Sequence, residues 1–335
     1  MVLEKKSRIK KKKQNALQKG VLRNWMNYYR NSVRGYSKPK KWPKILLLII
    51  FVALIVFVAT KYGSDLINYH KSNKLPVGKW HESNMVVAHA LGTVDGRVET
   101  NSEEALTESY ERGFRVFEAD LSLTSDNELV LRHDFDDTSY YNFEQDKTYT
   151  PHLTKNEFLS NPINGIYTPM TVDDIVKFLA KHKDTYLITD TKCTNKEDAV
   201  KQFTILKKTI DKANDPSLYS RIIVQLYNYD MKSWVESVTK FDNYILTLYQ
   251  MTNIDYNKVG KYCRDNKIEV VTMPQESCKR ERSQLLHDYG IKVYTHTVNK
   301  ILDLQSLLND VNVDGFYTDF ISPDDLKKAG VKKTI

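Results

Sequence analysis

The chain has 335 residues, a formal net charge of +8 and three cysteines. A chain of this length can bury a sizeable hydrophobic core, and so few cysteines exclude a disulfide-rich scaffold. The spacing of the cysteines suits no zinc site, and the sequence leaves open whether Cys263 and Cys278 pair.

The positive charge is concentrated at the N-terminus. Residues 1–44 contain 15 Lys or Arg and one acidic residue, Glu4, so this arm carries +14 and the rest of the chain carries −6. Trp and Tyr are interspersed among the basic residues, a mixture that can bind nucleic acid. Beside a membrane span, attraction to anionic lipids of the inner leaflet explains the same mixture. We therefore expect the arm to contact anionic lipids and not nucleic acid.

An uncharged apolar run, Ile45 to Thr60, follows the arm. As a helix it spans about 24 Å, less than the roughly 30 Å of a hydrocarbon core, and flanking Trp, Tyr and Lys side chains can cover the difference. A buried core helix is rarely apolar on every face, and a cleaved signal peptide has a shorter basic region. We expect a transmembrane signal anchor over residues 45–62, with the arm in the cytoplasm and the remainder outside the cell.

Residues 63–84 are polar and aperiodic, as in a stalk, and the domain expected at 85–335 alternates apolar runs with helical patterns. The apolar runs predict eight strands, at 85–91, 116–123, 185–192, 221–227, 243–249, 268–273, 291–298 and 313–319. The helical patterns between them cover 103–113, 171–182, 195–213, 231–241, 256–267, 279–290 and 301–311.

This alternation predicts an α/β fold, a (β/α)8 TIM barrel. A doubly wound open sheet competes with it, but the first strand is followed by AHALGTVDG and not by a glycine-rich GxGxxG loop. Residues 135–170 interrupt the alternation, and we expect them to form an insertion over the top of the barrel.

Polar side chains occur in pairs at the ends of three consecutive predicted strands. Residues two apart share one side of a strand, so each pair projects together. The pairs are Glu118 with Asp120, Asp190 with Lys192, and Gln225 with Tyr227. His89 ends the first strand, and His133 follows the short run ELVLRHD. A single polar pair on a strand usually marks only a solvent-exposed face. Buried parallel strands are otherwise apolar, so polar pairs at equivalent ends of three consecutive strands indicate a site.

These residue types suit hydrolysis of a phosphodiester. Carboxylates from Glu118, Asp120 and Asp190 can hold Ca²⁺ or Mg²⁺, which prefer oxygen ligands. Lys192 can offset developing negative charge, and His89 and His133 can act as base and acid in either order.

The sequence resembles the glycerophosphodiester phosphodiesterase family of phospholipase C-like barrels over roughly residues 85–320. The resemblance rests on the first histidine, on a G-x-x-x-x-E-x-D element with a T-x-D-x-x-x-V-x-x-H-D tail, and on a closing D-G-x-x-T-D. The matching residues are His89, Gly113, Glu118, Asp120, Thr124, Asp126, Val130, His133, Asp134, Asp314, Gly315, Thr318 and Asp319. The resemblance implies metal ligands at Glu118, Asp120 and Asp190 and an acid–base pair of His89 and His133.

Other family elements are altered in this sequence. The Glu-Asn-Thr element appears in another order as Glu99, Thr100 and Asn101, and the E-x-K strand appears as Asp190-Thr191-Lys192. We assign substrate or phosphate contacts to Lys192, Glu99, Asn101 and Gln225. Ala90 replaces the arginine that usually follows the first histidine, and His296 stands where tryptophan is common.

We therefore expect a membrane-anchored, extracytoplasmic, metal-dependent phosphodiesterase acting on glycerophosphodiesters, lipid headgroups or a polyol-phosphate polymer. A phospholipase C-type enzyme acting on inositol or sphingoid lipids is one alternative. A binding protein on a barrel without activity is another, and Ala90 is the observation that favours it.

Overall fold

The computed structural model describes residues 19–30, 50–53, 56–57, 75, 78–145 and 153–331. The chain forms two compact units, Met1–Ile67 and Asn68–Ile335. Residues 19–30 of the first unit form a helix. Across these ranges no helix combines the length and the apolar character that crossing a bilayer requires. The anchor predicted at 45–62 and the stalk predicted at 63–84 lie mostly outside the described residues, and both stay predictions.

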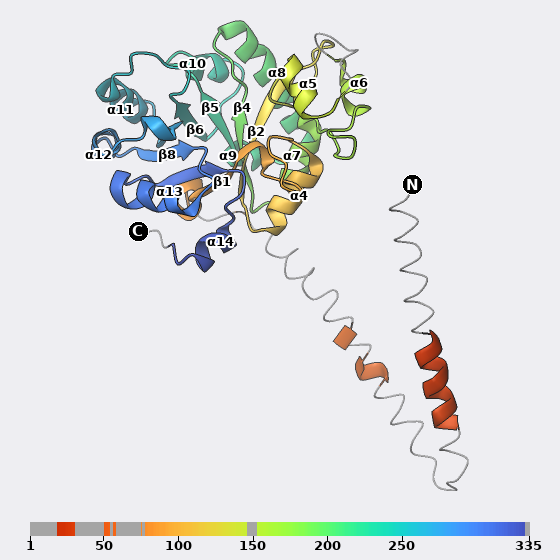
Figure 1. Cartoon of the computed structure of the whole chain (residues 1–335). Helices are drawn as coiled ribbons and strands as arrows, with labels where there is room; N and C mark the ends of the chain where they lie inside the picture. Colours follow the sequence, from red (N-terminus) through yellow and green to blue (C-terminus); the bar gives the residue numbers. More distant parts are fainter. Residues whose placement is uncertain are drawn as a thin grey trace. The chain divides into compact units, whose positions relative to one another are not determined.

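In the described part of the second unit, eight parallel strands close into a barrel (Figure 1). Their order around the barrel is β1-β2-β4-β5-β6-β7-β8-β9, and β9 pairs with β1 to close it. The strands are β1 Val86–Ala88, β2 Val116–Leu123, β4 Tyr186–Asp190, β5 Ile222–Leu226, β6 Asn243–Thr247, β7 Val270–Pro274, β8 Lys292–His296 and β9 Gly315–Thr318. Each predicted strand is present, so the predicted barrel is confirmed.

The interior of the barrel has an apolar half and a polar half. Alternation along each strand points every second side chain inward. Near the amino ends of the strands the inward side chains, Val116 and Ile188 among them, form an apolar cluster. Trp80, from α3 (Trp80–Ser83), belongs to the same cluster. Two residues further along the same strands, the inward side chains are the acids Glu118 and Asp190. A sheet covered on both faces is normally apolar throughout, so the polar half marks the functional end.

Helices cover the outside of the barrel. They are α4 Glu103–Glu111, α7 Val172–Lys181, α8 Lys196–Ala213, α9 Leu218–Arg221, α10 Met231–Glu236, α11 Tyr256–Asp265, α12 Arg280–Asp288, α13 Ile301–Ser306 with a π-helical turn at Leu307–Val311, and α14 Pro323–Lys328. Ser102, Asn195 and Asp255 begin α4, α8 and α11, because their side chains accept hydrogen bonds from backbone N–H groups of the first turn. The apolar faces of the helices pack on outward strand residues such as Phe117 and Leu187.

The chain between β2 and α7 departs from the strand–helix alternation. Its elements are β3 (Leu129–Leu131), which is antiparallel to β2, α5 (Asp137–Asn142) and α6 (Lys155–Leu159). The last two lie within the insertion predicted at 135–170. The Arg132 guanidinium lies over the rings of Phe135 and Tyr140. This packing fixes the chain immediately beside His133.

Candidate active site

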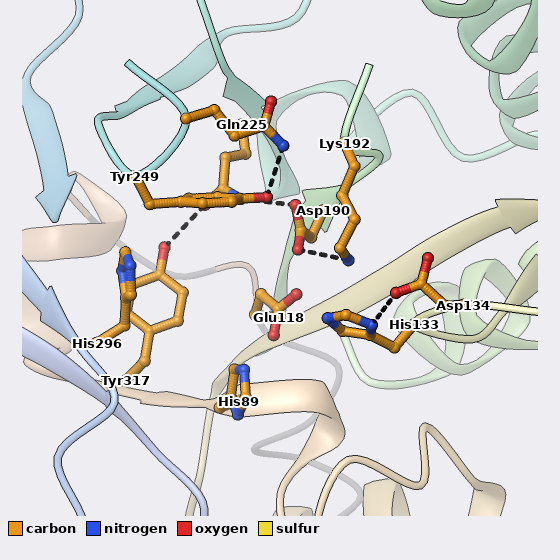
Figure 2. A pocket seen from close by; sticks show the side chains of 11 residues that line it. His89, Glu118, His133, Asp134, Asp190, Lys192, Gln225, Tyr249, His296 and Tyr317 are labelled. Atoms are coloured by element: carbon orange, nitrogen blue, oxygen red, sulfur yellow. Dashed lines mark hydrogen bonds and ion pairs between the residues drawn. The ribbon is translucent and has the colours of Figure 1, made fainter. Parts of the chain in front are cut away.

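A cavity of about 280 Å³ opens at the carboxyl ends of the barrel strands (Figure 2). Its walls come from β2, β4, β5, β8 and β9 and from the residues that follow β1, β3, β4 and β6. The lining residues are His89, Glu118, His133, Asp134, Asp190, Lys192, Gln225, Tyr249, Gln250, His296 and Tyr317. Most of the residues assigned to the site from the sequence therefore meet in one place.

Glu118, Asp120 and Asp190 form a buried acidic cluster. One carboxylate oxygen from each lies within 4.8 Å of the others. β2 supplies the first two because they are two residues apart, and the register between β2 and β4 places Asp190 opposite Asp120. Three carboxylates at this separation match the oxygen ligands that Ca²⁺ and Mg²⁺ prefer.

The Glu118 carboxylate has one oxygen that lacks a partner. Its Oε2 accepts a hydrogen bond from the backbone N–H of Ala90 at 2.8 Å. Its Oε1 is buried and has no hydrogen-bond partner among the described residues. Burial and the negative charge of Asp120 raise the pKa of Glu118. A buried oxygen without a partner is costly, and a cation bound between the acids would satisfy it, so the residues present fit a divalent cation.

Neighbouring side chains hold the other two acids. Lys192 Nζ donates to Asp120 and also to Asp190, the second at 2.9 Å. Gln225 donates to Asp190 Oδ1 at 3.0 Å, and the Tyr227 hydroxyl donates to the same oxygen. Burial alone would raise the pKa of Asp120, but the Lys192 ammonium and two nearby histidines outweigh burial and lower it. Asp120 therefore stays ionised.

His89 stands directly after β1, in a short 3-10 turn. Its Nδ1 is hydrogen-bonded to Asp319 Oδ1 at 2.8 Å. Asn299 holds Asp319 in turn, by donating to Oδ2 at 2.6 Å and accepting from the Asp319 backbone N–H at 2.9 Å. Burial lowers the pKa of His89, but the Asp319 hydrogen bond and the charge of Glu118 outweigh burial and raise the pKa to about 10. The carboxylate engages Nδ1, which leaves Nε2 for the cavity.

His133 borders the same cavity from the segment after β3. Its Nδ1 pairs with Asp134 Oδ2 at 2.5 Å, and both side chains are about half exposed. Figure 2 shows His133 and His89 on different sides of the cavity, with Glu118 between them in this view. The site thus has one imidazole that is 21% exposed and one that is about half exposed, each held through Nδ1 by a carboxylate.

The residues predicted to contact substrate lie in three kinds of position. Lys192 and Gln225 line the cavity. Glu99 is exposed and lies outside the cavity lining, contrary to the expectation from the sequence. Asn101 is fully buried behind the cavity, where it donates to the Asp120 carboxylate at 2.8 Å and accepts from its backbone N–H at 3.1 Å. Asn101 therefore supports an acid, and its side chain is not part of the lining.

Several lining residues were not assigned to the site from the sequence. Tyr249, His296 and Tyr317 form an aromatic wall, with ring centroids 5.9 and 5.8 Å apart and edges against faces. Burial and the charge of His89 lower the pKa of His296 to about 4, so this imidazole is neutral at physiological pH. Tyr249 lies two residues beyond Thr247 of β6. The alternation that identified Glu118 and Asp120 could therefore also have identified Tyr249.

Solved structures of other proteins share this fold. A phosphodiesterase from Oleispira antarctica in complex with the product sn-glycerol-3-phosphate is 14% identical, with a TM-score of 0.60 over 74% of this chain and 97% of that one. A glycerophosphodiester phosphodiesterase from Parabacteroides distasonis is 18% identical, with a TM-score of 0.57 over 73% and 96%. One from Thermotoga maritima is 16% identical, with a TM-score of 0.55 over 73% and 97%. At such identities the likeness shows the barrel fold.

The family model gives a more specific result. No curated protein sequence matches the chain. The model of the glycerophosphoryl diester phosphodiesterase family matches residues 94–322, which is more than half of the chain and contains Glu118, His133 and Asp190. The chain therefore belongs to the glycerophosphoryl diester phosphodiesterase family, whose members are phosphoric diester hydrolases.

Proposed function

We propose that the protein is a membrane-anchored, outward-facing phosphodiesterase that hydrolyses glycerophosphodiesters or a related polyol-phosphate or lipid-headgroup diester, with Ca²⁺ or Mg²⁺ as cofactor. The observation that supports this most is convergence. Glu118, Asp190 and two imidazoles line one cavity, and Asp120 joins the two acids in a cluster beside it, so that these five groups come together from four separate stretches of chain. The Oleispira antarctica enzyme with bound sn-glycerol-3-phosphate has a similar fold, which supports a glycerophosphodiester as the substrate.

Glu118, Asp120 and Asp190 would hold the cation. When bound, it would supply positive charge against the phosphodiester and against the charge that develops during cleavage. Lys192 adds an ammonium group beside the same carboxylates. Because Ala90 replaces the arginine common in the family, we assign to Lys192 a larger share of phosphate recognition.

The two histidines perform the proton transfers in this proposal. One imidazole removes the proton from the attacking hydroxyl, which belongs to water or to a neighbouring group of the substrate. The other donates a proton to the leaving oxygen. Asp319 and Asp134 hold His89 and His133 through Nδ1, which orients each ring and leaves Nε2 for these transfers.

The activity is tested with the full chain in detergent, on a panel of glycerophosphodiesters, lysolipids and polyol-phosphate polymers. We expect hydrolysis that requires Ca²⁺ or Mg²⁺, stops with chelator and is lost in His89→Ala and His133→Ala. Release of diacylglycerol or ceramide together with a phosphorylated headgroup would instead identify a phospholipase C-type enzyme. No turnover of any substrate, with either cation present, would contradict the proposal.

The proposed location rests on the charge distribution of the first 62 residues. A basic arm ahead of an uncharged run supports a cytoplasmic N-terminus and an outward barrel. Protease added to intact cells should remove the barrel and spare an epitope at the N-terminus. A barrel that resists protease until the cells are lysed would contradict this orientation.

A further inference from the structure

The helix at residues 19–30 exposes large apolar side chains. Its sequence is KGVLRNWMNYYR, which contains no acidic residue. The five clearest cases are between 55% and 77% exposed: Val21, Leu22, Trp25, Met26 and Tyr28. Lone exposed apolar residues need no explanation, but five within three helical turns are unusual for a soluble surface.

These side chains share one face of the helix. Residues 21, 22, 25 and 26 repeat at the interval of three to four that lines one side of an α-helix, and Tyr28 borders the same side. The rings of Trp25 and Tyr29 stack along it, with centroids 5.7 Å apart. The opposite side carries Arg23, Asn24, Asn27 and Arg30. The helix is therefore amphipathic, and its polar side is cationic.

This composition favours a membrane surface over a protein groove. Trp and Tyr prefer the interface between headgroups and acyl chains, and Arg and Lys attract anionic headgroups. Apart from Glu4, residues 1–44 contain no acid, so the whole arm complements an anionic surface in charge. A helix with an apolar face, an Arg-bearing face and low overall hydrophobicity lies in the plane of the interface.

The length of chain between the helix and the proposed anchor limits how far the helix can lie from the membrane. Fourteen residues, 31–44, separate Arg30 from the start of the predicted span at Ile45. Fully extended, they reach about 50 Å. If residues 45–62 cross the bilayer, the helix cannot leave the vicinity of the cytoplasmic leaflet.

We propose that residues 19–30 form an interfacial helix that inserts its Leu22–Trp25–Met26 face into the anionic cytoplasmic leaflet, parallel to the membrane plane. The arm is then a second point of membrane contact beside the span.

The test uses the full chain in nanodiscs of phosphatidylcholine and phosphatidylglycerol, with an NBD fluorophore on single introduced cysteines. The native thiols at Cys193, Cys263 and Cys278 are buried, so labelling under native conditions favours the new site. NBD at 21, 22, 25 and 26 should emit at shorter wavelength and be reduced by dithionite several-fold more slowly than NBD at 20, 23, 24 and 27. A flat profile along the helix would overturn the proposal.

Two charge-matched variants sharpen the result. Leu22→Asp and Asn24→Asp each lower the net charge by one, but they alter opposite faces of the helix. With NBD at 26, Leu22→Asp should abolish protection from dithionite and Asn24→Asp should retain it. Equal loss in both variants would show that charge alone holds the arm, which contradicts insertion.

Two further outcomes separate the interfacial helix from the proposed anchor and from the proposed activity. Co-elution with nanodiscs reports the anchor independently of the NBD profile. A chain that co-elutes but gives a flat profile overturns the interfacial helix alone, and a chain that does not co-elute overturns both. If NBD on the apolar face is protected from dithionite equally well in discs of pure phosphatidylcholine, the proposed preference of the helix for anionic lipid is overturned. Phosphodiesterase activity, which depends on residues of the barrel, is read separately in each case.

Discussion

His89 depends on residues that are distant from it in the sequence. Asp319 holds its Nδ1, and Asn299 holds Asp319 by two hydrogen bonds. A general acid or base works only when its proton travels along a defined line to the substrate, so orientation of the ring is part of catalysis. Asp319 is therefore a positioning residue.

Asp319→Asn tests this role. We expect kcat to fall about 10²-fold or more, because an oriented acid–base group contributes about 10²–10⁴-fold. KM should change little, and the pH profile of kcat should shift, because the amide no longer supports a charged imidazole. Steady-state kinetics across the range in which histidine titrates measures both. Asp324→Asn, in an exposed position of α14, is the control and should keep the wild-type kinetics. An unchanged pH profile in Asp319→Asn would contradict the role of Asp319 as a positioning residue.

Glu118→Gln tests the acidic cluster. Without cation the variant should be more stable than the wild type, because burial and Asp120 disfavour the ionised carboxylate. With Ca²⁺ or Mg²⁺ it should lose the rise in Tm that the wild type shows, which corresponds to about 2.7 kcal/mol at a hundredfold excess over Kd. Thermal unfolding with and without chelator measures both effects. Glu111→Gln, on an exposed position of α4, should keep the rise. A full cation response in Glu118→Gln would exclude this carboxylate as a ligand.

At the level of elements, two glycines permit close approach of rings. Gly315 begins β9, and a Cβ there would lie 2.3 Å from the ring of Tyr294. Gly260 lies in α11, and a Cβ there would lie 2.3 Å from the ring of Tyr289, just after α12. Neither glycine has an unusual backbone angle, so the requirement is one of space. The contact at Gly260 sets how closely α11 and α12 pack against each other.

Gly260→Ala should therefore destabilise the protein in spite of the higher helix propensity of alanine. We expect the free energy of unfolding to fall by about 1–3 kcal/mol, the usual effect of overpacking. Denaturant unfolding monitored by circular dichroism measures it. Lys261→Ala, on the exposed side of the same helix, should change stability by less than about 0.5 kcal/mol. Stabilisation by Gly260→Ala would show that Tyr289 moves aside at no cost.

At the scale of the whole molecule, the Asp314 side chain connects α12 and β8 by hydrogen bonds at the end of the barrel opposite the cavity. Its carboxylate accepts from His287 of α12 at 2.8 Å, from Lys292 of β8 at 2.8 Å and from the Val293 backbone N–H at 2.9 Å. Burial would raise the pKa of Asp314, but these hydrogen bonds and charges lower it to about 2. The ionised carboxylate is thus favoured in the folded state.

This pKa predicts a pH dependence of global stability. A carboxyl whose pKa is lower in the folded state stabilises above its unfolded pKa of 3.8, and that stabilisation is lost as the pH falls toward 2. It amounts to about 2 kcal/mol. Asp314→Asn lacks this contribution, so the difference in unfolding free energy between wild type and variant should shrink by about that amount between neutral pH and pH 2. Asp310→Asn is the exposed control. A difference independent of pH would contradict this account.

Much of the fold was predictable from the sequence alone. Each barrel strand is an apolar run, and the outer helices follow predicted helical patterns, except the short α9 and α14, which were not predicted. Both patterns are local properties of the chain. The pairing of Glu118 with Asp120, and the inward direction of Asp190, follow from alternation within single strands. The predicted segment boundaries at 44 and 62 lie outside the described residues and remain predictions.

Other parts of the site depend on contacts between distant residues. Glu99 and Asn101 are close in sequence and share a motif, yet one is exposed and the other is bonded to Asp120. The contact of His89 with Asp319 spans almost the whole barrel domain, and it exists because β9 pairs with β1. Local patterns assign residues to elements and to one side of a strand. Which side chains then meet is set by the closure and register of the barrel, because those fix the distances between residues far apart along the chain.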